Sequence, residues 1–239
     1  MSEHFGPKNA ATIILLRPQV AGEFEVFMTR RPAGMNFLGG MYVFPGGSVR
    51  KEDYSEAIVE RCHGLSRQEA QRILSMELSP ALSLGHWVAG IRELFEEVGV
   101  LLCVTEAGTP VDMGQEGNQE RLAAKRKSLI QKSMNFLTLL ESERLLCDVA
   151  HLAYFSHWLT PEESSIRFDT RFYLALLPAG QNPLAISEEV THSLWLTPER
   201  ALKFCQEGSL PLIMPTFSSL RTLADFDSLG SLLAEYRLG

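Results

Sequence analysis

Three glutamates crowd one turn of a predicted helix in the stretch 92–100. Glu93, Glu96 and Glu97 are spaced i, i+3, i+4, which places their carboxylates on one helical face. Three like charges on one turn repel each other and weaken the helix unless a cation lies among them. Carboxylate oxygens are ligands that Mg²⁺ and Mn²⁺ prefer. The spacing therefore favours a divalent-metal site, and the plain alternative is a solvated acidic helix face.

The residues around these glutamates support the metal interpretation. Leu94 and Val98 are four apart and can reach a core from another face, and Gly99 lies where a left-handed helix cap belongs. Arg92 precedes Glu96 by four positions, so it can pair with Glu96 or orient a neighbouring carboxylate. From ordinary residue frequencies, the whole pattern arises by chance in about one of tens of thousands of chains this long.

This pattern resembles the second half of the Nudix box, Gly-x5-Glu-x7-Arg-Glu-U-x-Glu-Glu-x-Gly-U, in which U is apolar. The stretch 44–47, Phe-Pro-Gly-Gly, looks like the start of the box, but Gly47 precedes Arg92 by 45 positions, so about 31 residues are inserted. Eight positions before Arg92 the box has a further glutamate, whereas this chain has Leu84. The usual partner of Arg92 is therefore missing or supplied from elsewhere.

The interruption resembles the branch of Nudix hydrolases typified by the peroxisomal coenzyme A diphosphatase. Three later stretches resemble that branch too, namely 158–161, 167–170 and 195–198. Coenzyme A-cleaving Nudix enzymes often carry Leu-Leu-Thr-x-Arg-Ser-x3-Arg-x3-Gly-x3-Phe-Pro-Gly-Gly. Thr29, Arg31, Gly40 and 44–47 match this motif here, but Pro32 and Asn36 replace its serine and second arginine.

The resemblance implies a fold, a cofactor and further site residues. The implied fold is α/β, a Nudix-like α/β/α sandwich with a mixed curved sheet and a helical insertion inside the box. The implied cofactor is Mg²⁺ or Mn²⁺, held by Glu93, Glu96, Glu97 and the backbone carbonyl of Gly46. A glutamate just before the last strand often binds metal or activates water in this family, and Glu189 is the candidate, with surface acidity as the alternative. The expected catalytic residues are Arg92, Glu93, Glu96, Glu97 and Glu189.

Four arginines are candidates for substrate binding. Arg30 and Arg31 follow a predicted strand, and we weigh a phosphate or adenine contact evenly against a solvated basic turn. Arg167 and Arg171 lie on a later predicted strand and could face the substrate.

The expected function is divalent-metal-dependent hydrolysis of a nucleoside diphosphate linked to another moiety. Coenzyme A or an acyl derivative is the preferred substrate class, and ADP-ribose or a nucleotide sugar is the runner-up. A non-catalytic, nucleotide-binding regulator is the alternative from another class. The complete set of Arg92, Glu93, Glu96 and Glu97 argues against a regulator, because binding alone does not need all the metal ligands.

Composition narrows the class of protein. The chain has 239 residues, of which 45% are hydrophobic and 21% charged, which is an ordinary globular composition. Its net charge of −7 argues against nucleic-acid binding, and no apolar run reaches membrane-spanning length. The four cysteines are far apart in sequence and are interpreted as reduced thiols. Without a secretory pattern or a peroxisomal C-terminus, we expect a cytoplasmic protein with a small-molecule substrate, and a homodimer is an expected assembly.

The positions of apolar and turn residues predict one domain over 1–239. We expect the helical insertion, about 50–82, to pack beside the metal site and to govern substrate choice. The basic run 125–127 is interpreted as a solvated helix face. The predicted strands are 10–16 and 24–29 as a hairpin, 39–47 leading into a loop, 100–104, 149–158, 167–177 and 193–196. The predicted helices are 53–62, 66–77, 80–98, 119–133, 135–146 and, near the C-terminus, several within about 198–237.

Overall fold

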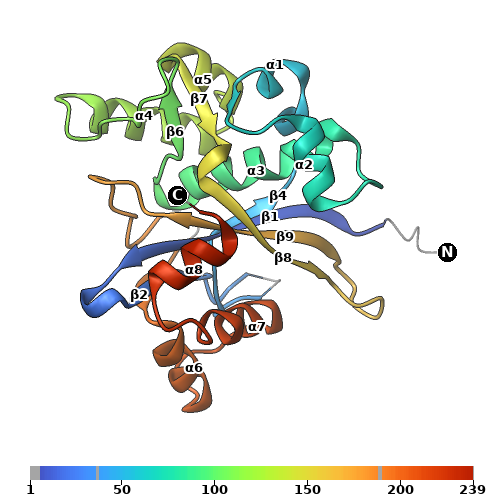
Figure 1. The fold of residues 1–239 in the computed structure, drawn as a ribbon, viewed down its shortest axis with the longest axis vertical. Helices are drawn as coiled ribbons and strands as arrows, with labels where there is room; N and C mark the ends of the chain where they lie inside the picture. Colours follow the sequence, from blue (N-terminus) through green and yellow to red (C-terminus); the bar gives the residue numbers. More distant parts are fainter. Residues whose placement is uncertain (1–5, 36–37, 188–189, 239) are drawn as a thin grey trace.

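A mixed β-sheet divides the computed structural model, which describes residues 6–35, 38–187 and 190–238, into layers (Figure 1). In these described ranges the sheet has seven strands, in the order β10-β2-β1-β9-β8, with β3 beside β2 and β4 beside β1. Its strands are β1 (Lys8–Pro18), β2 (Phe24–Arg30), β3 (Tyr42–Val43), β4 (Gly46–Ser48), β8 (Leu152–Leu159), β9 (Phe168–Leu176) and β10 (His192–Leu196).

Strand β1 lies at the centre of this sheet because its apolar run has both faces to bury. It pairs antiparallel with β2 and β4 and parallel with β9. Ile13 and Leu15 belong to one hydrophobic core, and Ile14 and Leu16 belong to another. The predicted hairpin of the first two strands is confirmed, and the sheet separates two cores.

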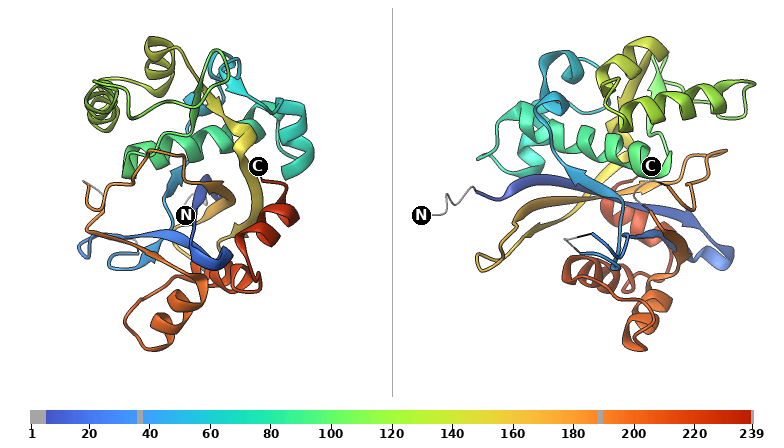
Figure 2. Two further views of the ribbon diagram at one scale, coloured as in Figure 1. Left: turned by 60° about the vertical axis from the view of Figure 1, so that its left-hand side comes forward. Right: turned by 180° about the vertical axis from the view of Figure 1, so that it is seen from behind.

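Helices cover both faces of the sheet (Figure 2). Helix α3 (Pro80–Val98) lies across one face, and three helices near the C-terminus lie on the other: α6 (Pro198–Gln206), α7 (Met214–Leu223) and α8 (Leu229–Tyr236). The predicted α/β/α sandwich with a mixed sheet is therefore confirmed. No helix of the described ranges is both long and apolar enough to cross a bilayer.

Helix α3 forms where the local signals predicted it. The Ser79 hydroxyl accepts a hydrogen bond from the Leu82 amide at 3.2 Å, and Pro80 starts the helix. Gly99 ends it in the left-handed conformation, with φ of 75°. Most of α3 is buried, because further segments pack over the side that faces away from the sheet.

Those covering segments are the insertion and the region after α3. The insertion contains η2 (Lys51–Tyr54), α1 (Glu56–Val59), β5 (Cys62–His63) and α2 (Arg67–Leu74). The later elements are β6 (Cys103–Thr105), α4 (Asn118–Ile130), α5 (Phe136–Glu143), β7 (Leu145–Asp148) and η3 (Val149–His151). Elsewhere, η1 (Val20–Gly22) joins β1 to β2. Strands β5, β7 and β6 form a separate small sheet in that order.

This small sheet explains why some predicted bounds are wrong. The helix predicted over 53–62 is a 3-10 turn, one short helix and then β5, and the strand predicted over 100–104 is β6, displaced toward the C-terminus. The helix predicted over 135–146 ends at Glu143, because Arg144 takes a left-handed φ of 53° and the chain enters β7. Pairing between distant segments overrides the helical periodicity there.

Other differences are smaller. The strand predicted over 39–47 consists of β3 and β4, and the strand predicted over 149–158 begins with η3 and becomes β8. Helix α2 starts with a capping box, in which Ser66 and Glu69 bond each other's amides.

The small sheet also brings three cysteines together that are distant in sequence. Cys147 is the register partner of both Cys62 and Cys103, and all three are free thiols, as is Cys205. The hydrogen bond with Cys103 and burial hold the pKa of the Cys147 thiol well above its usual range. A thiol with a raised pKa stays protonated and unreactive, so Cys147 packs as a small apolar side chain.

Candidate metal and diphosphate site

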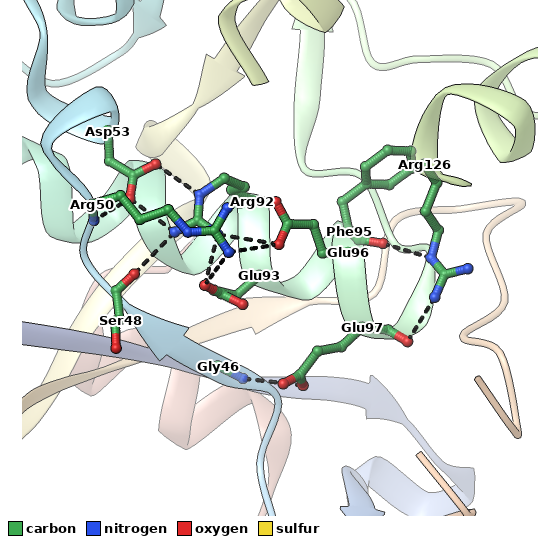
Figure 3. Close-up of polar contacts among 10 residues, drawn as sticks. All are labelled: Gly46, Ser48, Arg50, Asp53, Arg92, Glu93, Phe95, Glu96, Glu97 and Arg126. Carbon is green, nitrogen blue, oxygen red and sulfur yellow. Dashed lines mark hydrogen bonds and ion pairs between the residues drawn. The ribbon is translucent and has the colours of Figure 1, made fainter. Parts of the chain in front are cut away.

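The three glutamates lie on the turn of α3 that faces the glycine-rich loop (Figure 3). Glu93 and Glu97 are each 8% exposed. Glu93 Oε1 accepts a hydrogen bond from Arg92 at 2.6 Å, and Glu97 Oε2 accepts one from the Gly46 amide at 3.3 Å. Glu96 bonds Arg92 at 3.3 Å, so Arg92 contacts both the neighbouring carboxylates that its spacing predicted.

The partner of Arg92 is Asp53, in the first turn of the insertion. Arg92 Nε donates to Asp53 Oδ1 at 2.7 Å, and Arg92 Nη2 donates to Asp53 Oδ2 at 2.8 Å and to the Ser48 carbonyl at 3.0 Å. Both side chains are buried, at 2% and 1% exposure. Burial alone lowers the pKa of Arg92, but Asp53, Glu93 and Glu96 outweigh it and raise that pKa. A two-point ion pair thus fixes the guanidinium in place.

Asp53 was missed in the sequence, although its position carries a signal. It lies six residues after Gly47, which is the Gly-x5-acidic spacing of the first half of the box. The extra residues therefore lie between Asp53 and Arg92, and the first half of the box is intact apart from aspartate replacing glutamate. Leu84, which lies eight positions before Arg92, is buried in the apolar core.

A second arginine, Arg50, joins the glutamates, and nothing in the sequence marked it. Its Nη1 and Nη2 donate to the two carboxylate oxygens of Glu96 at 3.2 and 3.1 Å, and Nη2 lies 3.5 Å from Glu93 Oε1. Two guanidinium groups thus face four carboxylates, counting Asp53 and Glu97. The cluster keeps an excess of negative charge that a divalent cation would neutralise.

The pKa of the Glu93 carboxyl is raised above its ordinary value. Burial is the largest cause of this rise, and the charge of Arg92 opposes it. Adjacent Glu96 raises the pKa further. A cation bound beside Glu93 would favour the ionised form, because an opposite charge stabilises a buried carboxylate.

The loop needs glycine at both positions because neighbouring atoms lie very close to its backbone. A Cβ atom at Gly47 would lie 2.5 Å from Cδ of Glu93, and one at Gly46 would lie 2.4 Å from the Ala11 carbonyl oxygen. Any other residue would push the loop away from the carboxylates and from β1. That the Gly46 carbonyl binds metal stays a prediction.

The donor set suits Mg²⁺ or Mn²⁺, because it offers several carboxylates close to a backbone turn. In the arrangement described, however, no three His, Cys, Asp or Glu side chains of the described ranges are placed to hold a metal ion together. Arg50 and Arg92 hold the oxygens of Glu93 and Glu96, and the Gly46 amide holds Glu97. For these glutamates to converge on a cation, Arg50 must release Glu96.

The interpretation of 125–127 as a solvated helix face is wrong for Arg126. Its Nε donates to the Phe95 carbonyl at 3.0 Å and its Nη2 to the Glu97 carbonyl at 3.1 Å, so it caps the C-terminus of α3. Lys125 pairs with Glu143 at 2.6 Å, whereas Lys127 is exposed as predicted. Helix α4 thereby supports the turn that carries the glutamates.

The four arginines predicted to bind substrate contact other groups. Arg30 Nε donates to the Gly40 carbonyl, Arg167 Nε donates to the Thr160 carbonyl, and Arg171 pairs with Asp169. The buried Nε of Arg31 has no hydrogen-bond partner within the described ranges. Their substrate contacts stay predictions, and Glu189 lies outside the described residues.

The chain is similar to a family model and to several known proteins. A family model described as the NUDT19 Nudix domain matches residues 7–223. The acyl-coenzyme A diphosphatase NUDT19 of Xenopus laevis is 27% identical over 276 residues, covering 94% of this chain and 71% of that protein. The human acyl-coenzyme A diphosphatase NUDT19 is 27% identical over 242 residues, covering 90% of this chain and 64% of the human protein. The chain therefore spans about two thirds of the length of these relatives.

A solved structure shares the fold over its whole length. The crystal structure of a Nudix hydrolase from Alicyclobacillus acidocaldarius superimposes with a TM-score of 0.75 and 24% sequence identity, covering 99% of each chain. This likeness concerns the fold.

Proposed function

Because the chain belongs to the NUDT19 Nudix domain family of Nudix hydrolases, we propose that it hydrolyses the diphosphate of coenzyme A or acyl-coenzyme A with the help of a divalent metal ion. The observation that carries this proposal is the turn of Glu93, Glu96 and Glu97, held by the buried pair of Arg92 and Asp53. The names of the relatives support the substrate class.

The reaction is a hydrolysis without a redox step. Water adds to one phosphorus, the bond from that phosphorus to the bridging oxygen breaks, and the bridging oxygen leaves with the other phosphate. From coenzyme A the two products are 3′,5′-ADP and 4′-phosphopantetheine. When bound, Mg²⁺ or Mn²⁺ would supply neutralisation of the diphosphate charge and a more acidic water.

The residues of this chain have separable tasks in the proposal. Glu93, Glu96 and Glu97 hold the cation. Arg92, itself fixed by Asp53, keeps Glu93 and Glu96 oriented. A glutamate takes the proton of the attacking water, and Glu93, which is buried beside Arg92, is one candidate for this base. Glu189 is the other candidate for the base.

A panel of diphosphates tests the proposal. The protein is incubated with Mg²⁺, Mn²⁺ or chelator and with coenzyme A, a long-chain acyl-coenzyme A, ADP-ribose or UDP-glucose, and products are separated by chromatography. We expect metal-dependent cleavage, fastest for the coenzyme A compounds. Faster cleavage of ADP-ribose would transfer the proposal to the runner-up substrate. No cleavage of any compound would favour a nucleotide-binding regulator.

One substitution tests the metal ligands directly. We expect Glu97→Gln to lower kcat on the order of a thousandfold, because one ligating charge is lost at unchanged volume. Glu120→Gln is the matched control, since Glu120 is exposed on α4. Equal rates for the two variants at saturating Mg²⁺ would remove Glu97 from the site. Circular dichroism confirms that both variants are folded.

A cytoplasmic location and a homodimer belong to the same proposal. The free thiols support a reducing compartment, and the resemblance to Nudix hydrolases supports the dimer. Cell fractionation tests the location, and light scattering coupled to size exclusion tests the dimer.

A further inference from the structure

A cavity of about 680 Å³ lies beside the three glutamates. One wall comes from the insertion, through Arg50, Ser55 and Ile58. Another wall is formed by residues 132–138, which are the turn between α4 and α5 and the start of α5, and to which the sequence had assigned no role. The cavity has the volume of a typical small-molecule site, roughly 300–1,000 Å³.

This cavity adjoins the glutamates through shared residues. A smaller pocket of about 90 Å³ is lined by Glu93, Glu96 and Glu97. Arg50, Glu96, Leu129 and Lys132 line both spaces. A substrate whose diphosphate lies at the glutamates can therefore extend into the larger cavity past Arg50 and Lys132.

The walls of the larger cavity suit a slender chain that alternates alkyl and amide groups. Ile58, Leu129 and Phe136 supply buried apolar surface. Ser133 and Asn135 supply polar groups: the Ser133 hydroxyl donates to the Ser128 carbonyl and Asn135 Oδ1 caps α5, so the amide nitrogen of Asn135 is the group that a ligand carbonyl can contact. The buried carboxylate of Asp53 in this lining is already paired with Arg92, so it does not require a cation from the ligand.

Lys132 stands out at the junction of the two spaces. Its φ of 57° is left-handed, a conformation in which glycine or asparagine is the usual residue after a helix. Among the described residues no hydrogen bond or ion pair involves its ammonium group. Like Arg50, it lines both spaces, so it adds positive charge where an anion would pass.

We propose that the larger cavity binds the pantetheine arm of coenzyme A and its acyl esters, and that Lys132 binds the phosphate at the start of that arm. This inference rests on the proposed function and deepens it. It assigns the specificity for the arm to two segments, the insertion and the α4–α5 turn, and not to the insertion alone.

Binding of the two reaction products tests this assignment without turnover. Calorimetric titrations measure 4′-phosphopantetheine and 3′,5′-ADP against the metal-loaded protein and its variants. We expect Ser133→Trp, which fills the cavity, to weaken 4′-phosphopantetheine about tenfold and to change 3′,5′-ADP less than about twofold. We expect Lys132→Met to weaken 4′-phosphopantetheine about tenfold through loss of one charge-assisted hydrogen bond.

Matched controls are available on α4. Lys127→Met and Ala123→Trp change exposed residues outside both linings, and we expect both to bind the products as the wild type does. Unchanged 4′-phosphopantetheine affinity in Ser133→Trp, or equal weakening of the two products, would overturn the cavity assignment. Unchanged affinity in Lys132→Met would overturn the role of Lys132.

Failure of the proposed function would look different from failure of this inference. A wild-type protein that neither cleaves coenzyme A nor binds 4′-phosphopantetheine would remove the proposed function and the inference with it. A wild type that cleaves coenzyme A, with variants that bind both products normally, would remove the inference alone.

Discussion

Two clusters of polar and charged side chains pack against α3, and they differ in how their charged groups are paired. The site cluster consists of Arg50, Asp53, Arg92, Glu93, Glu96 and Glu97. The β9 cluster consists of His86, His157, Asp169, Arg171 and Tyr173. In the site cluster the side-chain bonds join guanidinium groups to carboxylates. In the β9 cluster Asp169 pairs with Arg171 and His157, but among the described residues His86 Nε2, Arg171 Nε and the Tyr173 hydroxyl are buried without a hydrogen-bond partner.

The two arginines make the difference plain. Burial acts on both, but the pKa of Arg92 is raised because carboxylates surround it, whereas burial lowers the pKa of Arg171. In the same β9 cluster, burial lowers the pKa of His86 to about 4, so its imidazole is neutral at pH 7. A buried group stays ionised where charges of the opposite sign outnumber its own. A bound metal cation needs the same surroundings, with an excess of carboxylates. The site cluster meets that condition and the β9 cluster does not.

The largest expected effect comes from unpairing the buried guanidinium of the site cluster. Asp53→Asn removes the charge that faces Arg92 in two hydrogen bonds, and we expect the free energy of unfolding to fall by about 3–5 kcal/mol. The matched change in the β9 cluster is His157→Gln, which breaks the partly exposed pair with Asp169 and should cost about 1 kcal/mol or less. Urea unfolding measures both, and equal costs would contradict the comparison.

The next prediction concerns the neutral state of His86 and its effect on stability. Its pKa is about 4 in the folded protein and 6.5 in the unfolded chain, so between these values the unfolded chain binds more protons. Stability then rises with pH across this window, by up to about 3 kcal/mol, and is fully present above pH 6.5. We expect His86→Gln to lack this increment, with His157, Asp53 and Arg171 unchanged around it.

Unfolding free energies of wild type and His86→Gln, measured at steps from pH 4 to 7, test this. The difference between the two proteins should change across the window and become constant above it. Parallel curves throughout would show that burial does not shift the pKa of His86.

The smallest effect concerns Arg50, which bonds the carboxylate of Glu96 from outside the helix. If metal competes with this guanidinium, Arg50→Gln should enlarge the stabilisation that Mg²⁺ provides over chelator by about 1 kcal/mol. Arg67→Gln is the control, since Arg67 pairs with Glu56 on the surface of the insertion. Thermal melts with Mg²⁺ and with chelator measure the change. A smaller metal effect in Arg50→Gln than in the control would show that Arg50 supports metal binding.

The sequence by itself determined the parts of this site that depend on neighbours along the chain. Ser79, Pro80 and Gly99 bound α3 through hydrogen bonds and backbone angles within a few residues. The i, i+3, i+4 spacing then placed Glu93, Glu96 and Glu97 on one turn. The sequence also predicted the Gly46–Gly47 loop, because glycine is the residue that permits a backbone to approach a ligand or another segment closely.

Tertiary structure alone decided what surrounds that turn. Arg50 and Arg126 reach the glutamate turn across the packed elements, and the small sheet joins Cys62, Cys103 and Cys147 from three distant segments. Asp53 had a spacing signal, yet its bond to Arg92 spans 39 positions and forms only when the insertion folds back over α3. Such contacts depend on how segments far apart in the chain pack, and local propensity and periodicity carry no information on that.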